Sequence, residues 1–136
     1  MRDEREPILE FSFTLPKIGV GKHKNEYVLM NNAAIWLRFY KSAIANKFKE
    51  HICSWSIPES SLKLGSGRIE YQLYRPNKKR LDSDAPSYVY KWVMDSIVSQ
   101  GYFKDDDQIT LVLRPCIVER DRVETEVLVK VYGYEN

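Results

Sequence analysis

Apolar and polar residues alternate at every second position in several short segments of the chain, a pattern typical of strands with one face buried. Residues 8–15 show the alternation first, and Pro16 ends it. The same pattern predicts strands over residues 68–74, 108–118 and 123–132, and the last two are expected to form a hairpin. Such strands need a second layer that covers their apolar face.

Two longer segments repeat apolar residues at steps of three and four, which indicates helices. The first follows Asn31 or Asn32, either of which can cap it, and must end before Pro58. The second starts at Pro86, which fits a first helical turn, and Gly101 is a natural left-handed stop. The order strand, helix, strand, helix, strand, strand predicts an α+β fold, a sheet with two main helices on one face.

Length and composition restrict the class of protein. The 136 residues are expected to form one domain over 1–136, with residues 1–7 as a charged tail. A hydrophobic content of 43% with 29% charged residues fits a globular chain. Cys53 and Cys116 lie far apart in apolar surroundings, which predicts two buried free thiols. No apolar run suits a membrane span or a signal peptide, so a cytoplasmic location is expected.

Acidic residues form two groups, one on each side of the second predicted helix. Asp82 and Asp84 precede this helix, and the triplet 105–107 follows it. The groups can meet only if the end of the strand before Asp82 lies beside the start of the strand at residue 108. Converging carboxylates would suit Mg²⁺, which prefers oxygen ligands. Alternatively, Asp84 only caps the helix, and the triplet only forms a solvated turn.

Basic residues gather in two loops that flank the predicted acidic centre. The net charge is only +2, so their placement matters more than their number. Such loops can neutralise DNA phosphates, with a metal offsetting the acidic charge, or they are simply solvated surface. The glycine-containing loops lack a phosphate-loop pattern, so no nucleotide cofactor is expected. The candidate DNA-binding residues are Lys17, Lys22 and Lys24 in the first loop, and Arg75, Lys78, Lys79 and Arg80 in the second.

Residues 79–109 resemble the RusA family of Holliday junction resolvases, which is common in prophages. That family carries a D-x-D motif after a basic run, then K-x-x-x-D in a helix, then G-x-x-x-D-D-x-Q. The matching residues are Asp82 and Asp84, then Lys91 and Asp95, then Gly101, Asp105, Asp106 and Gln108. Two positions depart from the family: Ala85 replaces the usual Asn, and Tyr88 stands where the lysine usually occurs, so that Lys91 comes three residues later.

The resemblance implies a compact homodimer with a mixed sheet that cuts four-way DNA junctions symmetrically in recombination and repair. It implies a nuclease that depends on Mg²⁺, for which Mn²⁺ can substitute. It also implies that Asp82, Asp84 and Asp106 are metal ligands, that Lys91 is the essential lysine, and that Asp105 is a further candidate ligand.

Two other functions remain open from the sequence. One is a non-catalytic module that binds branched or single-stranded DNA through the basic loops. The other is a nuclease of broader range among branched DNAs with the same acidic site. Cleavage of a synthetic junction with and without Mg²⁺ separates the binding module from either nuclease.

Overall fold

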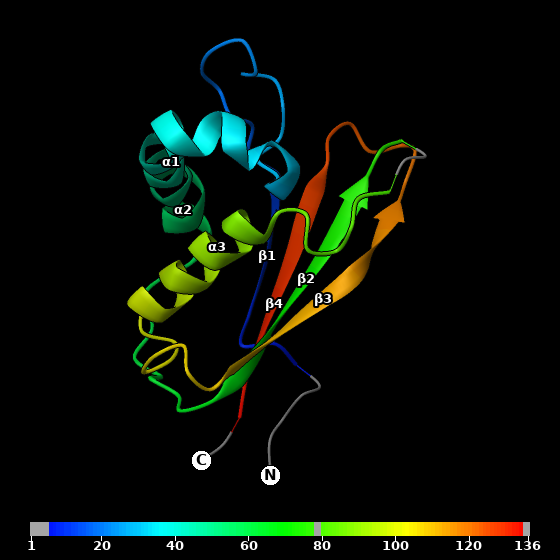
Figure 1. The fold of residues 1–136 in the computed structure, drawn as a ribbon. Helices are drawn as coiled ribbons and strands as arrows, with labels where there is room; N and C mark the ends of the chain where they lie inside the picture. Colours follow the sequence, from blue (N-terminus) through cyan, green and yellow to red (C-terminus); the bar gives the residue numbers. More distant parts are fainter. Residues whose placement is uncertain (1–5, 78–79, 135–136) are drawn as a thin grey trace.

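The computed structural model describes residues 6–77 and 80–134. It confirms an α+β fold, in which the helices lie on one face of a four-stranded sheet (Figure 1). In chain order the elements are β1 (Leu9–Thr14), η1 (Met30–Asn32), α1 (Ala33–Phe48), η2 (Lys49–Cys53), α2 (Ser54–Ser56), β2 (Gly67–Arg75), α3 (Ser87–Ser99), β3 (Ile109–Val118) and β4 (Glu126–Gly133).

The sheet has the order β1-β4-β2-β3 and is mixed. β4 pairs antiparallel with β1 and with β2, whereas β2 and β3 run parallel. The predicted hairpin of the last two strands is therefore wrong, because β4 inserts between β1 and β2. Two physical reasons explain this. A strand–helix–strand unit such as β2-α3-β3 favours parallel pairing, and Pro115 suits β3 to an edge, where a missing N–H is tolerated.

The first helical segment continues through α1, η2 and α2 and ends at Ser56, before Pro58 as predicted. Its middle section, η2, is a π-helix, a wider turn that shifts the side chains of the following residues around the axis. The second helix, α3, begins at Ser87 directly after Pro86. Both helical segments thus match the predicted spacing of apolar residues.

The core lies between the helices and the central strands. In β4 the side chains of Val127, Val129 and Val131 are fully buried, and Tyr71 and Leu73 of β2 are equally inaccessible. Burial of each such apolar side chain stabilises the fold by about 1.5–3 kcal/mol. The core therefore fixes β2 and α3, the two elements that carry the acidic loop between them.

Both cysteines are free thiols, as predicted. Cys53 in η2 and Cys116 in β3 are buried, at 2% and 3% exposure. They behave as small apolar core residues in this position.

Candidate functional site

The loop between β2 and α3 presents Asp82 and Asp84 to solvent on a fixed backbone. The carbonyl of Asp82 accepts from Ala85 N at 3.0 Å, and that of Asp84 accepts from Ser87 N at 3.0 Å. The carbonyl of Ala85 accepts from Met30 N at 2.9 Å, which ties the loop to η1. Among the described residues neither carboxylate has a partner. Exposed carboxylates without partners are available to an outside ligand.

Asp84 does not cap α3 with its side chain. The N-cap residue is Pro86, and no side chain within the described part of the chain forms a cap hydrogen bond there. The purely structural explanation for Asp84, that it caps this helix, is therefore not what the structure shows. Its charge instead acts on Tyr90, one turn into the helix. Burial raises the pKa of Tyr90, and the charges of Cys116 and Asp84 raise it further.

Lys91 lies exposed on α3, in the second turn after the acidic loop. It forms no ion pair with Asp95 in the described part of the chain, although the spacing of four residues would allow one. Tyr88, which stands where the resembled family has its lysine, packs edge-on against Trp36 with ring centroids 5.4 Å apart. Lys91 is thus the cation that α3 offers near the acidic loop.

The second acidic group, Asp105–Asp107, forms an exposed turn between α3 and β3. Asp105 Oδ1 accepts from Asp107 N at 3.0 Å, so one carboxylate stabilises the turn itself. Asp106 and Asp107 are exposed, and their side chains have no partner among residues 6–77 and 80–134. The triplet therefore forms an exposed turn, as the alternative interpretation expects, and in this turn the Asp106 carboxylate is open to an outside ligand.

The two acidic groups lie at opposite ends of the sheet. Parallel pairing places Gly67 beside Ile109 at one end and Arg75 beside Val118 at the other. Eight residue steps along a strand span about 26 Å, and the 13 residues of α3 between the groups span about 20 Å. The end of β2 therefore does not lie beside the start of β3, which was the condition for the two acidic groups to meet within one chain. The described residues likewise contain no group of three or more metal-ligating side chains.

Three of the predicted basic residues lie close to other groups of the protein or have a buried side-chain nitrogen. Lys17 Nζ lies 3.8 Å from Glu124 Oε2 and 5.4 Å from the ring centroid of Tyr27. Arg80 Nη1 donates to the carbonyl of Cys116 at 2.9 Å, which holds the loop before Asp82 against β3. Arg75 Nε is buried and has no hydrogen-bond partner in the described structure.

The other predicted lysines split into two cases. Lys22 and Lys24 are exposed, and neither ammonium group has an acidic partner among the described residues. Lys78 and Lys79 lie outside the described residues. The first basic loop therefore offers two cations to an external anion.

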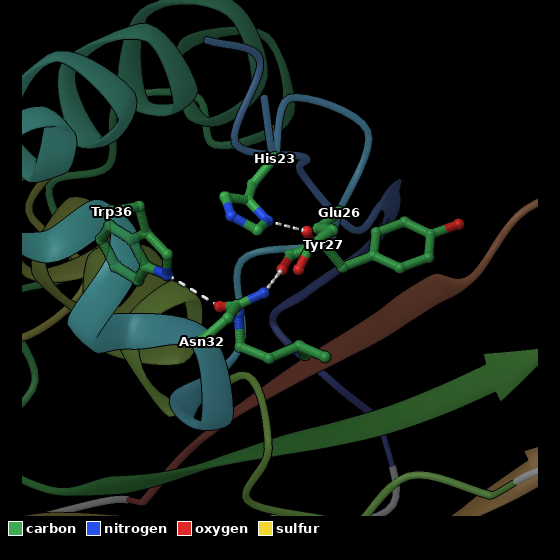
Figure 2. A network of polar contacts seen from close by, with 6 residues as sticks. His23, Glu26, Tyr27, Asn32 and Trp36 are labelled. Atoms are coloured by element: carbon green, nitrogen blue, oxygen red, sulfur yellow. Dashed lines mark hydrogen bonds and ion pairs between the residues drawn. The ribbon is translucent and has the colours of Figure 1, made fainter. Parts of the chain in front are cut away.

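A buried amide holds this first loop against the start of α1. Asn32 Nδ2 donates to the carbonyl of Tyr27 at 2.8 Å, and its Oδ1 accepts from Trp36 Nε1 at 2.8 Å (Figure 2). The same oxygen accepts from Leu29 N at 3.2 Å. In the loop itself, His23 contacts Glu26. Lys22 and Lys24 are thus carried on a loop that is positioned by α1.

Sequence reasoning missed a group of residues on the exposed side of α1. Phe39 is 71% exposed, and the guanidinium of Arg38 lies 5.3 Å from its ring centroid. Lys41 Nζ lies 5.3 Å from the ring centroid of Tyr88 on α3. The signal that could have found them is the run Arg38-Phe39-Tyr40-Lys41, in which cations and aromatic rings are adjacent in a helix.

Neither the models of protein families nor the curated proteins contain a match to this chain. Within the described residues, no helix is long and apolar enough to cross a membrane.

Proposed function

We propose that this protein is a structure-selective endodeoxyribonuclease that resolves four-way DNA junctions by Mg²⁺-dependent phosphodiester hydrolysis, in recombination and repair. The observation that carries the proposal is the loop of Asp82 and Asp84, whose backbone is fixed while both carboxylates stay exposed and unpartnered in the described structure. The resemblance of residues 79–109 to RusA-type resolvases supports the same function. Mn²⁺ is expected to substitute for Mg²⁺.

The donor chemistry of the acidic loop suits Mg²⁺, but one chain provides only part of a site. Carboxylate oxygens are the ligands that this ion prefers, and it commonly keeps several waters. Asp82 and Asp84 would hold it from one chain, and Asp106 would complete the set, with Asp105 engaged in its turn. A bound Mg²⁺ would supply an activated water and stabilise the leaving oxygen. Because of the distance between the acidic groups, Asp106 would come from a second copy.

A two-fold pairing of β3 edges would bring the acidic groups together. β3 lies at the edge of the sheet, and its Leu111 and Ile117 are 43% and 40% exposed. An unpaired edge of this kind is a template for another strand. If Ile109 lies opposite Arg114 of an antiparallel second copy, Asp106 of that copy falls opposite Ile117. Ile117 is adjacent to Cys116, whose carbonyl accepts from Arg80. Arg80 precedes Asp82 by two residues, so Asp106 of the second copy would approach Asp82.

The exposed cations have separate roles in this proposal. Lys91 would stabilise the charge that develops on the phosphate in the transition state, or orient the attacking water. Lys22 and Lys24 would contact phosphates of the junction arms, together with Lys78 and Lys79. Phosphate contacts position the DNA without reading its sequence. A homodimer would apply two such sites to the two-fold symmetric junction, which accounts for paired cuts.

Cleavage of a synthetic four-way junction tests the proposal. The wild-type protein should cut the junction with Mg²⁺ and should not cut it with EDTA. Asp82→Asn should remove cleavage and retain or improve junction binding, because it removes a ligand and a charge that repels phosphate. Wild-type cleavage by Asp82→Asn, or no cleavage by the wild-type protein at any Mg²⁺ or Mn²⁺ concentration, would contradict the proposed activity.

The separation of the acidic groups within one chain favours a second candidate, a non-catalytic module that binds branched or single-stranded DNA. In that case the basic loops bind the DNA, and junction binding persists without metal-dependent cleavage. A nuclease of broader range differs from a junction-specific one in its substrates, because it cuts forks and flaps as readily as four-way junctions. The assay therefore includes a fork and a linear duplex of matched sequence.

A further inference from the structure

The exposed surface between α1 and the first basic loop combines aromatic rings with cations. An exposed phenylalanine alone is ordinary in a folded protein. Phe39, however, borders a hollow of about 220 Å³ that lies between the helix and the loop. This volume is several times the ~30 Å³ that one water occupies in the liquid. Its lining includes Val20, Lys22, His23, Trp36, Phe39 and Tyr40.

Basic side chains outnumber acidic ones around this hollow. Arg38 lies over the Phe39 ring at 5.3 Å, Lys22 lines the hollow, and Lys24 is exposed in the same loop. The acidic residue nearest in this loop, Glu26, is in contact with His23. An exposed ring bordered by cations that have no acidic partner among residues 6–77 and 80–134 matches the chemistry of a nucleotide, which has an aromatic base and an anionic phosphate.

The hollow is connected to the acidic loop through packed side chains. Trp36, part of its lining, packs edge-on against Tyr88 in the first turn of α3. Lys41 lies over the same Tyr88 ring, and Met30 N donates to Ala85 O between Asp84 and Pro86. The basic loop arches beside the start of α1 (Figure 1), and Asn32 fixes it there (Figure 2). A DNA strand that runs from Asp82 and Asp84 across Tyr88 and Trp36 would reach Phe39.

We propose that Phe39 and the adjoining hollow bind one unpaired nucleobase at the branch point of the DNA. The base stacks on the Phe39 ring, and its phosphate lies on Lys22 and Lys24. This inference rests on the proposed function for the identity of the DNA. It adds a selective element, since a base at a branch can leave its stack at lower cost than a base in a continuous duplex. Phe39 thus distinguishes branched DNA from linear DNA.

A fluorescent base analogue tests this inference without cleavage. A four-way junction that carries 2-aminopurine at the branch is titrated with protein in EDTA. The wild-type protein should raise the fluorescence, because the base leaves its neighbours. Phe39→Ala should abolish this rise and weaken junction binding about tenfold, or about 1.4 kcal/mol, within the range for stacking of one base. Phe39→Tyr retains a ring and should behave like the wild type.

Trp55→Ala is the matched control. Trp55 is 85% exposed, but it lies in α2 and does not line the hollow beside Phe39. Its loss should change neither fluorescence nor affinity. If Phe39→Ala gives the same rise in fluorescence as the wild type, the inference is overturned. Mg²⁺-dependent cleavage by the wild type would still support the proposed nuclease. A Phe39-dependent response in a protein that never cleaves supports the base site and removes the nuclease proposal.

Discussion

The side-chain amide of Asn32 is the group that joins the basic loop to the helical layer. Asn32 is 8% exposed, and it bonds Tyr27 in the loop, Leu29 before η1 and Trp36 in α1. A buried amide with several partners is costly to replace, because each partner left without a hydrogen bond loses about 1–3 kcal/mol. One residue therefore couples stability to the position of Lys22 and Lys24.

Asn32→Ala is expected to lower the free energy of unfolding by about 2–3 kcal/mol, measured by urea denaturation. Under conditions where the variant is still folded, its junction affinity should also fall, since the loop is no longer held on α1. Asn31→Ala, at an exposed neighbouring position, is the control. It should change stability by no more than about 0.5 kcal/mol. Equal effects of the two substitutions would show that the Asn32 bonds are not what positions the loop.

Tyr71 and Tyr90 form a buried pair between β2 and α3, stacked with ring centroids 4.1 Å apart. The Tyr71 hydroxyl donates to the carbonyl of Tyr90 at 2.7 Å. Burial raises the pKa of Tyr71 well above its ordinary value, and the charges of Tyr90, Cys53 and Asp95 add to the shift. The pKa of Tyr90 is raised mainly by burial as well. In the folded protein both phenols therefore keep their protons when exposed tyrosines lose theirs.

This pair predicts a loss of stability at alkaline pH. Below about pH 10 the phenols are neutral in both states, so their contribution is constant. Above that pH the unfolded chain loses protons that the folded chain keeps, and the free energy of unfolding falls by up to about 1.4 kcal/mol per pH unit for each tyrosine. Urea denaturation at pH 8, 10 and 11 measures the slope. Tyr71→Phe should make it shallower above pH 10, and an equal slope in both proteins would contradict this cause.

At the scale of elements, the end of α3 determines where the second acidic turn begins. Gly101 has φ +97°, and its N–H donates to Val98 O while Tyr102 N donates to Ile97 O. These two bonds form a Schellman motif, which requires the left-handed residue at this position. A Cβ at Gly101 would also lie 2.1 Å from the carbonyl oxygen of Ser60. The turn of Asp105–Asp107 follows from this fixed end.

Gly101→Ala is expected to destabilise the fold by more than about 1 kcal/mol, the cost of the left-handed conformation alone. Gly19→Ala provides the matched comparison, because Gly19 also has positive φ, +78°, but a Cβ at this position would meet no atom closer than an ordinary 3.8 Å. Thermal or urea unfolding should therefore show a smaller loss for Gly19→Ala. If the two losses are equal, the contact with Ser60 is relieved by a small backbone movement.

Most elements were predictable because their signals are local. The alternation of β1 and β4, the apolar stripe of α3 and the stop at Gly101 are each contained in a few consecutive residues. The pairing of β4 with β1 and β2 could not be predicted from such local signals. It joins residues far apart in the chain and depends on which strand buries its apolar face best. Pro115 was the overlooked clue that β3 belongs at an edge.

At the scale of the whole molecule, the geometry of the candidate site also depends on contacts between residues far apart in the chain, which the sequence alone does not reveal. The residue types and their order in the motif could be identified from the sequence, but whether Asp82 meets Asp106 depends on strand direction. Parallel pairing of β2 with β3 separates them within one chain. An antiparallel relation between two copies reverses the order of β3 and so exchanges its ends. The quaternary structure, which one sequence does not display, thus decides whether the acids can share an ion.

Mixing two inactive variants tests that arrangement. If each site takes Asp82 and Asp84 from one chain and Asp106 from the other, a heterodimer of Asp82→Asn with Asp106→Asn has one site with both substitutions and one site with neither. The mixture should therefore regain Mg²⁺-dependent cleavage, with about a quarter of the wild-type number of intact sites after random exchange of subunits. Each heterodimer should nick one strand and leave the junction unresolved. A denaturing gel detects the nicked strand, and a native gel shows that the four-way junction is still intact.

Mixing Asp82→Asn with Asp84→Asn is the control, because both substitutions affect the same half of the site and every dimer keeps two damaged sites. This mixture should stay inactive. Restored cleavage in the first mixture alone assigns the site to two chains. If neither mixture cleaves although light scattering shows exchanged dimers, the acids do not act across the interface, and the separation of about 26 Å along the parallel strands then argues for a DNA-binding module without catalysis.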